Sequence, residues 1–261
     1  MGCGLALHRS MDDIVKQYEG LVSADAAGKQ KVEGNLFAGL DELLKLYEKA
    51  LWGGMLMSDE RVSLPGIRYP ALKPEEISRF LLETIAYETD RTRRILFDSA
   101  GLRTGVFISG LINASYKAGN RRFRLNTTCL TNADYLGHLA RGREGRPLII
   151  EIQGSAGYRS GSYAKHSIIS VSGNAGSQFG WYASHCTISI GGDTEWYCCA
   201  HARNSTVTIY GSAGEDFGFG AKQCVFKSPK IKTLERIAQN IRKGNKLYLM
   251  RPNGKEELVW K

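Results

Sequence analysis

The apolar positions of the chain follow two different periods, and the first of them is helical. Over residues 28–53 large apolar side chains recur at spacings of three and four, which predicts an amphipathic helix. A capping-box-like start predicts a shorter helix over residues 10–21. Pro74, followed by two glutamates, predicts a further helical stretch that continues to Gly101. Residues 1–101 are therefore predicted to form an α-helical region.

From about Leu102 onward the apolar pattern repeats every nineteen residues. Each repeat contains two apolar positions separated by one residue, so both side chains point to the same face of a β-strand. Chance does not produce several such columns in one frame. The first column holds Ile150, Ile169, Ile188, Val207 and Phe226, and the second holds Ile152, Val171, Ile190 and Ile209.

Small residues keep the same nineteen-residue frame. Glycine is expected at corners, where the backbone needs a positive φ or approaches another backbone closely. The alanine column predicts an interior side with no room for a larger side chain. Two earlier alanines, Ala118 and Ala140, fit this column at longer intervals, which indicates surface insertions such as RGREGRP at 141–147. The repeated small residues are Gly154, Gly157, Gly161, Ala164, Gly173, Gly176, Gly180, Ala183, Gly192, Ala202, Gly211, Gly214, Gly218 and Ala221.

This periodicity predicts a mainly β protein with α-helical additions, built around a single-stranded, three-sided parallel β-helix of about five coils. Nineteen residues at about 3.3 Å each give a circumference of about 60 Å, which suits three short strands and three corners. The β-helix is assigned to residues 102–228. Residues 229–261 are predicted to add a helix over 231–243 and a hairpin that turns at Asn253 and Gly254. The helical region and this C-terminal segment would cap the two ends of the coil stack.

The segments GSAGYRSGSYA, GNAGSQFGWYA and GSAGEDFGFGA share the pattern IxVxGxAGxxxGxxA. This pattern resembles the GXGXG β-helix domain at the C-terminus of the glutamate synthase large subunit, and it is similar to the GXGXG repeat found in formylmethanofuran dehydrogenase. The resemblance covers roughly residues 102–228, although Glu195 and Cys199 stand where glycine is expected. In these families the domain is a spacer without active-site residues or an accessory part of a larger complex. The resemblance therefore implies the fold and a structural role in assembly.

The charge of the chain is unevenly distributed. Residues 1–104 carry 14 Lys and Arg against 16 Asp and Glu, a net of −2, and residues 105–261 carry 21 against 10, a net of +11. A basic region of this kind favours contact with an acidic protein surface, including the helical region of a second copy, or with phosphate groups. The aromatic residues Tyr158, Tyr163, Trp181 and Tyr182 could add base stacking. The candidate anion-binding residues are Arg121, Arg122, Arg124, Arg141, Arg143 and Arg146.

The sequence predicts a cytoplasmic protein without membrane contact. No apolar run approaches the roughly 20 residues that cross a bilayer, and the first residues lack the pattern of a secretory signal. The six cysteines are therefore expected to be free thiols. No cofactor is expected, because the chain contains no flavin, iron–sulfur or amidotransferase motif.

Three clusters are candidates for chemistry, each with a simpler structural interpretation. His166 and His185 share a column and could hold a metal, but no third ligand is evident, and an outer polar ladder explains them as well. Cys199, close to His201, replaces a corner glycine and could expose a reactive thiol, whereas Cys198 falls in a column of core phenylalanines. Four acidic residues at 193, 195, 215 and 216 could bind calcium as in β-helix lyases, but a solvated patch is simpler.

These observations predict a non-catalytic β-helix scaffold that mediates protein–protein association, as a homo-oligomer or as one component of a complex. The alternative is a protein that binds an anionic polymer, nucleic acid or an acidic glycan, on its basic surface. A β-helix enzyme is the third interpretation.

Overall fold

The computed structural model describes residues 39–58, 61–91, 100–128, 130 and 133–260. All elements below belong to one unit, residues 39–261. The helix predicted over 10–21, and the first part of the helix predicted over 28–53, lie outside the described residues. In chain order the elements are α2 (Leu40–Trp52), β1 (Leu56–Ser58), β2 (Arg61–Ser63), α3 (Pro74–Arg91), α4 (Ala100–Lys117), β3 (Arg122–Asn126), β4 (Leu148–Gln153), β5 (Ser167–Val171), β6 (Thr187–Ile190), β7 (Thr206–Ile209), β8 (Val225–Ser228), α5 (Ile231–Asn240), β9 (Lys246–Met250) and β10 (Glu256–Trp260).

The helices before the sheet share a small aromatic core. Tyr47 of α2, Phe80 of α3 and Phe107 of α4 are fully buried, and their ring centroids lie 5.3 to 5.8 Å apart. Aromatic pairs at this spacing stabilise a core beyond the area that they bury. α3 begins at Pro74, as the sequence predicts. β1 and β2 form a short antiparallel pair that the helical period does not predict.

α4 corrects the predicted start of the β-helix. The chain is helical as far as Lys117, and the first strand of the coil stack begins at Arg122 rather than near residue 102. Ala118, which the repeat assigned to the alanine column, is instead exposed in the turn after α4. Gly119 follows with a φ of 117°, a conformation that favours glycine just beyond the end of a helix.

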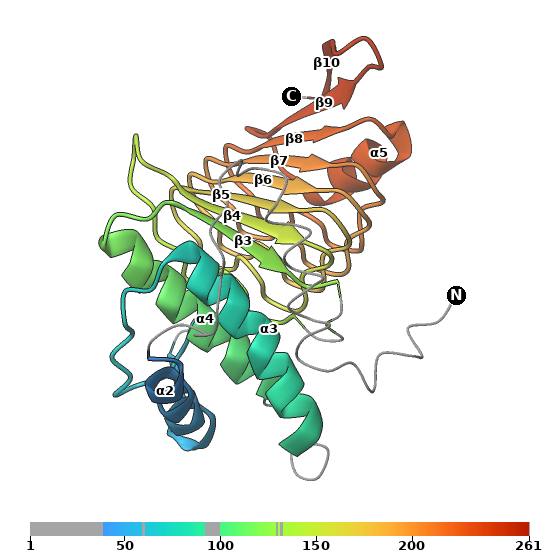
Figure 1. The fold of residues 1–261 in the computed structure, drawn as a ribbon. Coiled ribbons are helices and arrows are strands. Elements are labelled where there is room, and N and C mark those ends of the chain that lie inside the picture. Colours follow the sequence, from blue (N-terminus) through green and yellow to red (C-terminus); the bar gives the residue numbers. More distant parts are fainter. Residues whose placement is uncertain (1–38, 59–60, 92–99, 129, 131–132, 261) are drawn as a thin grey trace, which may run out of the picture. The chain divides into compact units, whose positions relative to one another are not determined.

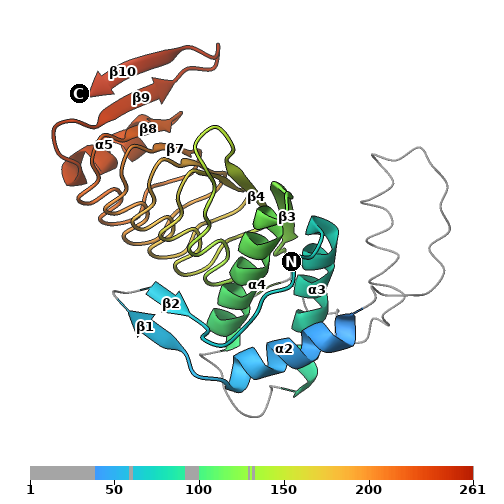
Figure 2. The same ribbon diagram turned by 90° about the vertical axis from the view of Figure 1, so that its left-hand side faces the viewer.

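The nineteen-residue repeat forms a parallel β-solenoid of about five turns (Figures 1 and 2). β4 to β8 pair in parallel, and partners such as Ile150 and Ile169 are nineteen positions apart. β3 and β9 extend this sheet at its two ends, and β10 adds an antiparallel strand outside β9. On the other two sides of the solenoid, neighbouring coils are joined by isolated parallel β-bridges, which form one row on each side. These rows join Ala156, Ala175 and Thr194, and Arg141, Lys165, Ser184, Arg203 and Lys222.

The predicted core columns are confirmed. Every member of the first apolar column is fully buried, and the pairing aligns each member with the next, up to Val207 with Phe226. The second column is buried in the same way. The alanine column is also interior from Ala140 onward, with no member more than 2% exposed. The solenoid therefore has one continuous apolar interior.

The corner glycines serve the two purposes that the sequence predicts. Gly161, Gly180 and Gly218 have φ values of 64° to 69° and are the third residues of tight turns, as in type II turns. Gly211 has no such φ but faces the backbone of the preceding coil. A Cβ at this position would lie 2.1 Å from the carbonyl oxygen of Gly192. A side chain there would separate the two coils.

The two ends of the sheet differ. α3 contacts β3 at one end, next to α4, whereas the amphipathic α5 contacts β8 and β9 near the other (Figure 1). α5 buries Leu234 and Ile237 and ends at Asn240, three residues before the predicted end. The predicted hairpin is confirmed, with β9 and β10 on either side of Asn253 and Gly254. β10 is the last strand of the sheet.

Candidate functional site

The six arginines predicted to bind anions fall into two groups. Arg121, Arg122 and Arg124 lie at the start of the sheet, in and next to β3. Arg141, Arg143 and Arg146 lie in the insertion between the alanine column and β4. All six are exposed, but their side chains have different partners.

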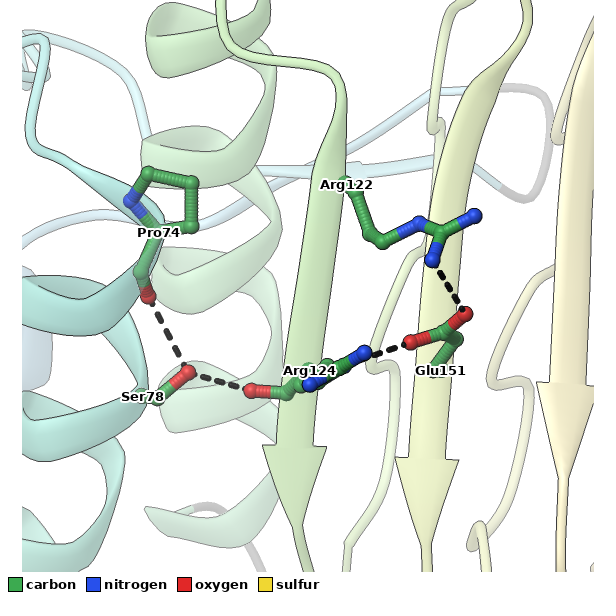
Figure 3. A network of polar contacts seen from close by, with 5 residues as sticks. All are labelled: Pro74, Ser78, Arg122, Arg124 and Glu151. Carbon is green, nitrogen blue, oxygen red and sulfur yellow. Dashed lines mark hydrogen bonds and ion pairs between the residues drawn. The ribbon is translucent and has the colours of Figure 1, made fainter. Parts of the chain in front are cut away.

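On β3, the two outward-facing arginines share one carboxylate of the next strand. Glu151 of β4 lies between them, with oxygens 3.0 Å from Arg124 Nε and 3.7 Å from an Arg122 terminal nitrogen (Figure 3). β3 and β4 pair Arg124 with Glu151 directly, so this contact follows from the strand register. These two arginines are therefore poor candidates for a free anion-binding surface.

The same strand is capped on its outer side. The Ser78 hydroxyl of α3 lies within hydrogen-bonding distance of the carbonyl oxygens of Pro74 and Arg124 (Figure 3). The Arg124 carbonyl belongs to the edge of the sheet. α3 thus covers the β3 edge and satisfies one of its backbone acceptors.

The insertion at 141–147 forms a hollow together with the end of α4. The hollow has a volume of about 450 Å³. Lys117 on α4 and two arginines of the insertion bring three cationic side chains to it. Within the part of the chain that the structure describes, none of these three has a carboxylate at ion-pair distance. The lining residues are Asn113, Tyr116, Lys117, Leu139, Arg141, Gly142 and Arg143.

The histidine column is confirmed as a stack. The rings of His166 and His185 lie 4.8 Å apart between centroids, at an angle of 34°. Asn204, one coil further, lies 3.5 Å from His185 Nε2 through its side-chain nitrogen. The residues that the structure describes contain no group of three or more His, Cys, Asp or Glu side chains that could hold a metal ion. The ring stack and the Asn204 contact form the outer polar ladder that the sequence predicts.

Cys199 is not exposed, which corrects the expectation from its corner position. Its side chain is fully buried, and that of Cys198 is as well. Burial raises the pKa of the Cys199 thiol well above its usual value, and it raises the pKa of Cys198 to about 12. A nucleophilic cysteine needs a thiolate, so neither residue is suited to that chemistry.

The acidic residues of the third coil have partners within the chain, and on the fourth coil a Glu215 oxygen lies 3.9 Å from an Arg236 terminal nitrogen. Glu195 accepts hydrogen bonds from the backbone and the hydroxyl of Ser177, the latter at 2.7 Å. Asp193 accepts one from the backbone N–H of Ser212 at 2.7 Å. Such bonds join one coil to the next and give these carboxylates a structural role.

An aromatic ladder follows one corner of the solenoid. Tyr163 and Tyr182 stack with centroids 5.2 Å apart, and Tyr182 stacks on His201 at 4.8 Å. The Arg159 guanidinium lies 4.5 Å from the Trp181 ring centroid beside this ladder. Because the rings cover each other's faces, Tyr182 has no free face on which a nucleic-acid base could stack.

The sequence missed the α4 part of the hollow. The predicted β-helix included Asn113, Tyr116 and Lys117. No feature of the sequence therefore indicated that these residues lie beside the arginines of the insertion. A signal was available in Lys117 and Gly119, because helices often end with a basic residue in the last turn and a glycine just beyond it.

None of the described helices is both long and apolar enough to span a membrane. No known protein family, no curated protein and no solved structure matches this chain.

Proposed function

We propose that this protein is a non-catalytic, cytoplasmic β-solenoid scaffold that associates with a second copy of itself through β10. The observation that carries the proposal is the open edge of the eight-stranded sheet. β10 pairs only with β9, and Glu256 to Val259 are all exposed. The outer side of such a strand offers unpaired backbone donors and acceptors to another strand.

The side chains of β10 favour pairing with an identical strand. Leu258 is 46% exposed and Val259 is 38% exposed, so an apolar surface accompanies the free backbone. Glu256 is paired with Lys227 at 2.7 Å, and Glu257 with Arg251 at 2.6 Å. In an antiparallel pair centred on Leu258, each glutamate would face Trp260 or Val259 rather than another glutamate. No like charges would therefore oppose each other.

The other end of the sheet limits this association to two copies. α3 covers β3, so a molecule that pairs through β10 presents no second open edge of the same sheet. An irregularity in the pairing near Val259 also shortens the regular part of the edge. A two-fold, self-complementary contact then closes, and no fibre grows from it.

Two further observations support a structural role over the alternatives. The repeat resembles the GXGXG β-helix domains, which implies a spacer or an accessory part of a complex. A polyanion track on the basic surface is less favoured, because Arg122 and Arg124 are both engaged by Glu151. The buried thiols likewise give little support to a cysteine-dependent enzyme.

A charged substitution on β10 tests the proposal. In the Leu258→Lys variant, two lysines would face each other on the two-fold axis, and the dimer should dissociate at least about tenfold more readily in sedimentation. Ile168→Lys is the matched control, because Ile168 is 37% exposed in β5, inside the same sheet. The proposal fails if the edge variant and the control associate as strongly as the wild type.

A further inference from the structure

The hollow beside the end of α4 contains cationic side chains to which the preceding description assigns no role. Its cations come from two separate segments. Lys117 is in the last turn of α4, and Arg141 and Arg143 come from the insertion before β4. Three positive charges so close together repel each other unless an anion is present.

Neighbouring charges do not compensate these three residues. Glu144 lies between Arg143 and Gly145 at the tip of the insertion, is exposed, and makes no ion pair with a described residue. Arg146 is already engaged, because its guanidinium donates to the carbonyl oxygen of Gly119 at 2.7 Å and lies over the Tyr116 ring. Arg146 therefore holds the insertion in place. The other three cations remain available to bind a ligand.

The backbone that carries the two arginines is fixed against α4 by one asparagine. Asn113 accepts a hydrogen bond from the Arg141 N–H at 3.0 Å. Its side-chain nitrogen donates to the carbonyl oxygens of Leu139 and Ser109. The side chain thus joins α4 to the residues on both sides of the alanine at 140.

The remainder of the insertion is equally constrained. Arg143 and Arg146 exchange two backbone hydrogen bonds of 3.0 and 3.1 Å across a tight turn. Gly142 lies against the next coil, where a Cβ would be 1.9 Å from the His166 carbonyl oxygen. The Tyr116 hydroxyl donates to the Arg146 carbonyl oxygen. A loop held in this way loses little conformational freedom when a ligand binds.

We propose that this hollow binds a small molecule that carries a di- or triphosphate group. Two guanidinium groups can each grip phosphate oxygens with paired hydrogen bonds, and Lys117 adds a third positive charge. The volume of about 450 Å³ lies in the usual range of small-molecule sites. Leu139 and the buried Tyr116 line the same hollow and provide an apolar wall for the organic part of the ligand.

An extended polyanion fits this site less well than a compact one. The next exposed arginines along the sheet, Arg122 and Arg124, are paired with Glu151. The row that begins at Arg141 continues along the coils with the single exposed cations Lys165, Arg203 and Lys222, whereas the hollow gathers three cations at one place. Binding here is also separate from association through β10, which lies at the opposite end of the sheet.

Calorimetric titration of the full-length protein with inorganic triphosphate tests the proposal. We expect saturable one-to-one binding at low and at physiological salt, weaker at the higher salt. Arg141→Ala and Arg143→Ala should each weaken binding at least about tenfold, because each removes a charge-assisted contact. Arg141→Lys should restore part of the loss, since it keeps the charge without the planar fork.

The Arg122→Ala, Arg124→Ala double variant is the matched control, since it removes two exposed arginines that lie outside the hollow and share the Glu151 carboxylate. Its affinity should change by less than about threefold. Unchanged thermal unfolding would establish that each variant still folds. The proposal is overturned if triphosphate does not bind, or if the control loses as much affinity as Arg141→Ala. It is also overturned if a single-stranded oligonucleotide binds more tightly than triphosphate and is equally sensitive to Arg141→Ala.

Discussion

At the scale of single residues, left-handed backbone conformations recur at fixed places in every coil. Cys199 has a φ of 54° in the column that glycine occupies at 161 and 180. In another column, Tyr163 and His201 also have a positive φ. A non-glycine residue costs of order 1 kcal/mol in this region. The neighbouring coils maintain the conformation, as when Cys199 N–H donates to the Phe179 carbonyl oxygen at 2.7 Å.

The alanine column leads to a prediction about packing. Ala183 is fully buried between Ala164 and Ala202 of the adjacent coils. Ala183→Leu would force extra carbon atoms into this filled space, so we expect it to lower the free energy of unfolding by about 1–3 kcal/mol. Denaturant unfolding measures this change. Thr187→Leu, on the exposed side of β6, should have little effect, and equal stability of both variants would place Ala183 outside the core.

The residue columns show how far the sequence determines this fold. The apolar and alanine columns of the regular coils could be predicted, because each interior position repeats one side-chain volume. The left-handed backbone conformation of the tyrosines and histidines could not be predicted. Stacking between coils determines it, and the local preference of these residues does not. The burial of Cys199 was missed for the same reason. Its backbone occupies a corner, but its side chain points inward.

At the scale of elements, glycine explains why α4 was not predicted. A Cβ at Gly105 would lie 1.7 Å from the Asp134 carbonyl oxygen, and one at Gly110 would meet the Tyr69 ring. These glycines let α4 pack closely, although glycine disfavours helices by its intrinsic preference. Tertiary packing therefore overrides the local signal. Because α4 was not predicted, its contribution to the hollow (Asn113, Tyr116 and Lys117) was not predicted either.

The partners of Arg122 and Arg124 could not be predicted either. β3 pairs with β4 at an offset that places Arg124 beside Glu151, unlike the nineteen-residue offset of the later coils. This offset depends on how the insertion at 141–147 folds. The sequence indicates that residues are inserted, but not which strand residues then face each other.

The contact between α3 and β3 gives a prediction at the same scale. Ser78→Ala removes the hydroxyl that lies against the Arg124 carbonyl oxygen at the sheet edge. We expect a loss of about 1 kcal/mol in the free energy of unfolding, which is typical of one hydrogen bond. Ser63→Ala, at an exposed site in β2, is the control. If denaturant unfolding finds both variants as stable as the wild type, α3 does not cap β3 through this hydroxyl.

At the scale of the whole molecule, the solenoid has one closed end and one open end. α3 covers β3, while β10 leaves its outer edge exposed beyond the reach of α5 on β8 and β9. Repeat proteins need such end caps, because each coil otherwise presents a free edge to the next chain. The open edge is the feature on which the proposed association depends, and the cationic hollow lies at the other end.

The mass of the protein in solution tests the central proposal most directly. Light scattering over micromolar concentrations should give twice the chain mass of 28.8 kDa, because one open edge per molecule allows one partner. The mass should be the same at low and physiological salt, since backbone hydrogen bonds and apolar contacts are screened little by ions. A mass of 28.8 kDa in both salts, or one that grows steadily with concentration, would contradict a dimer formed through β10.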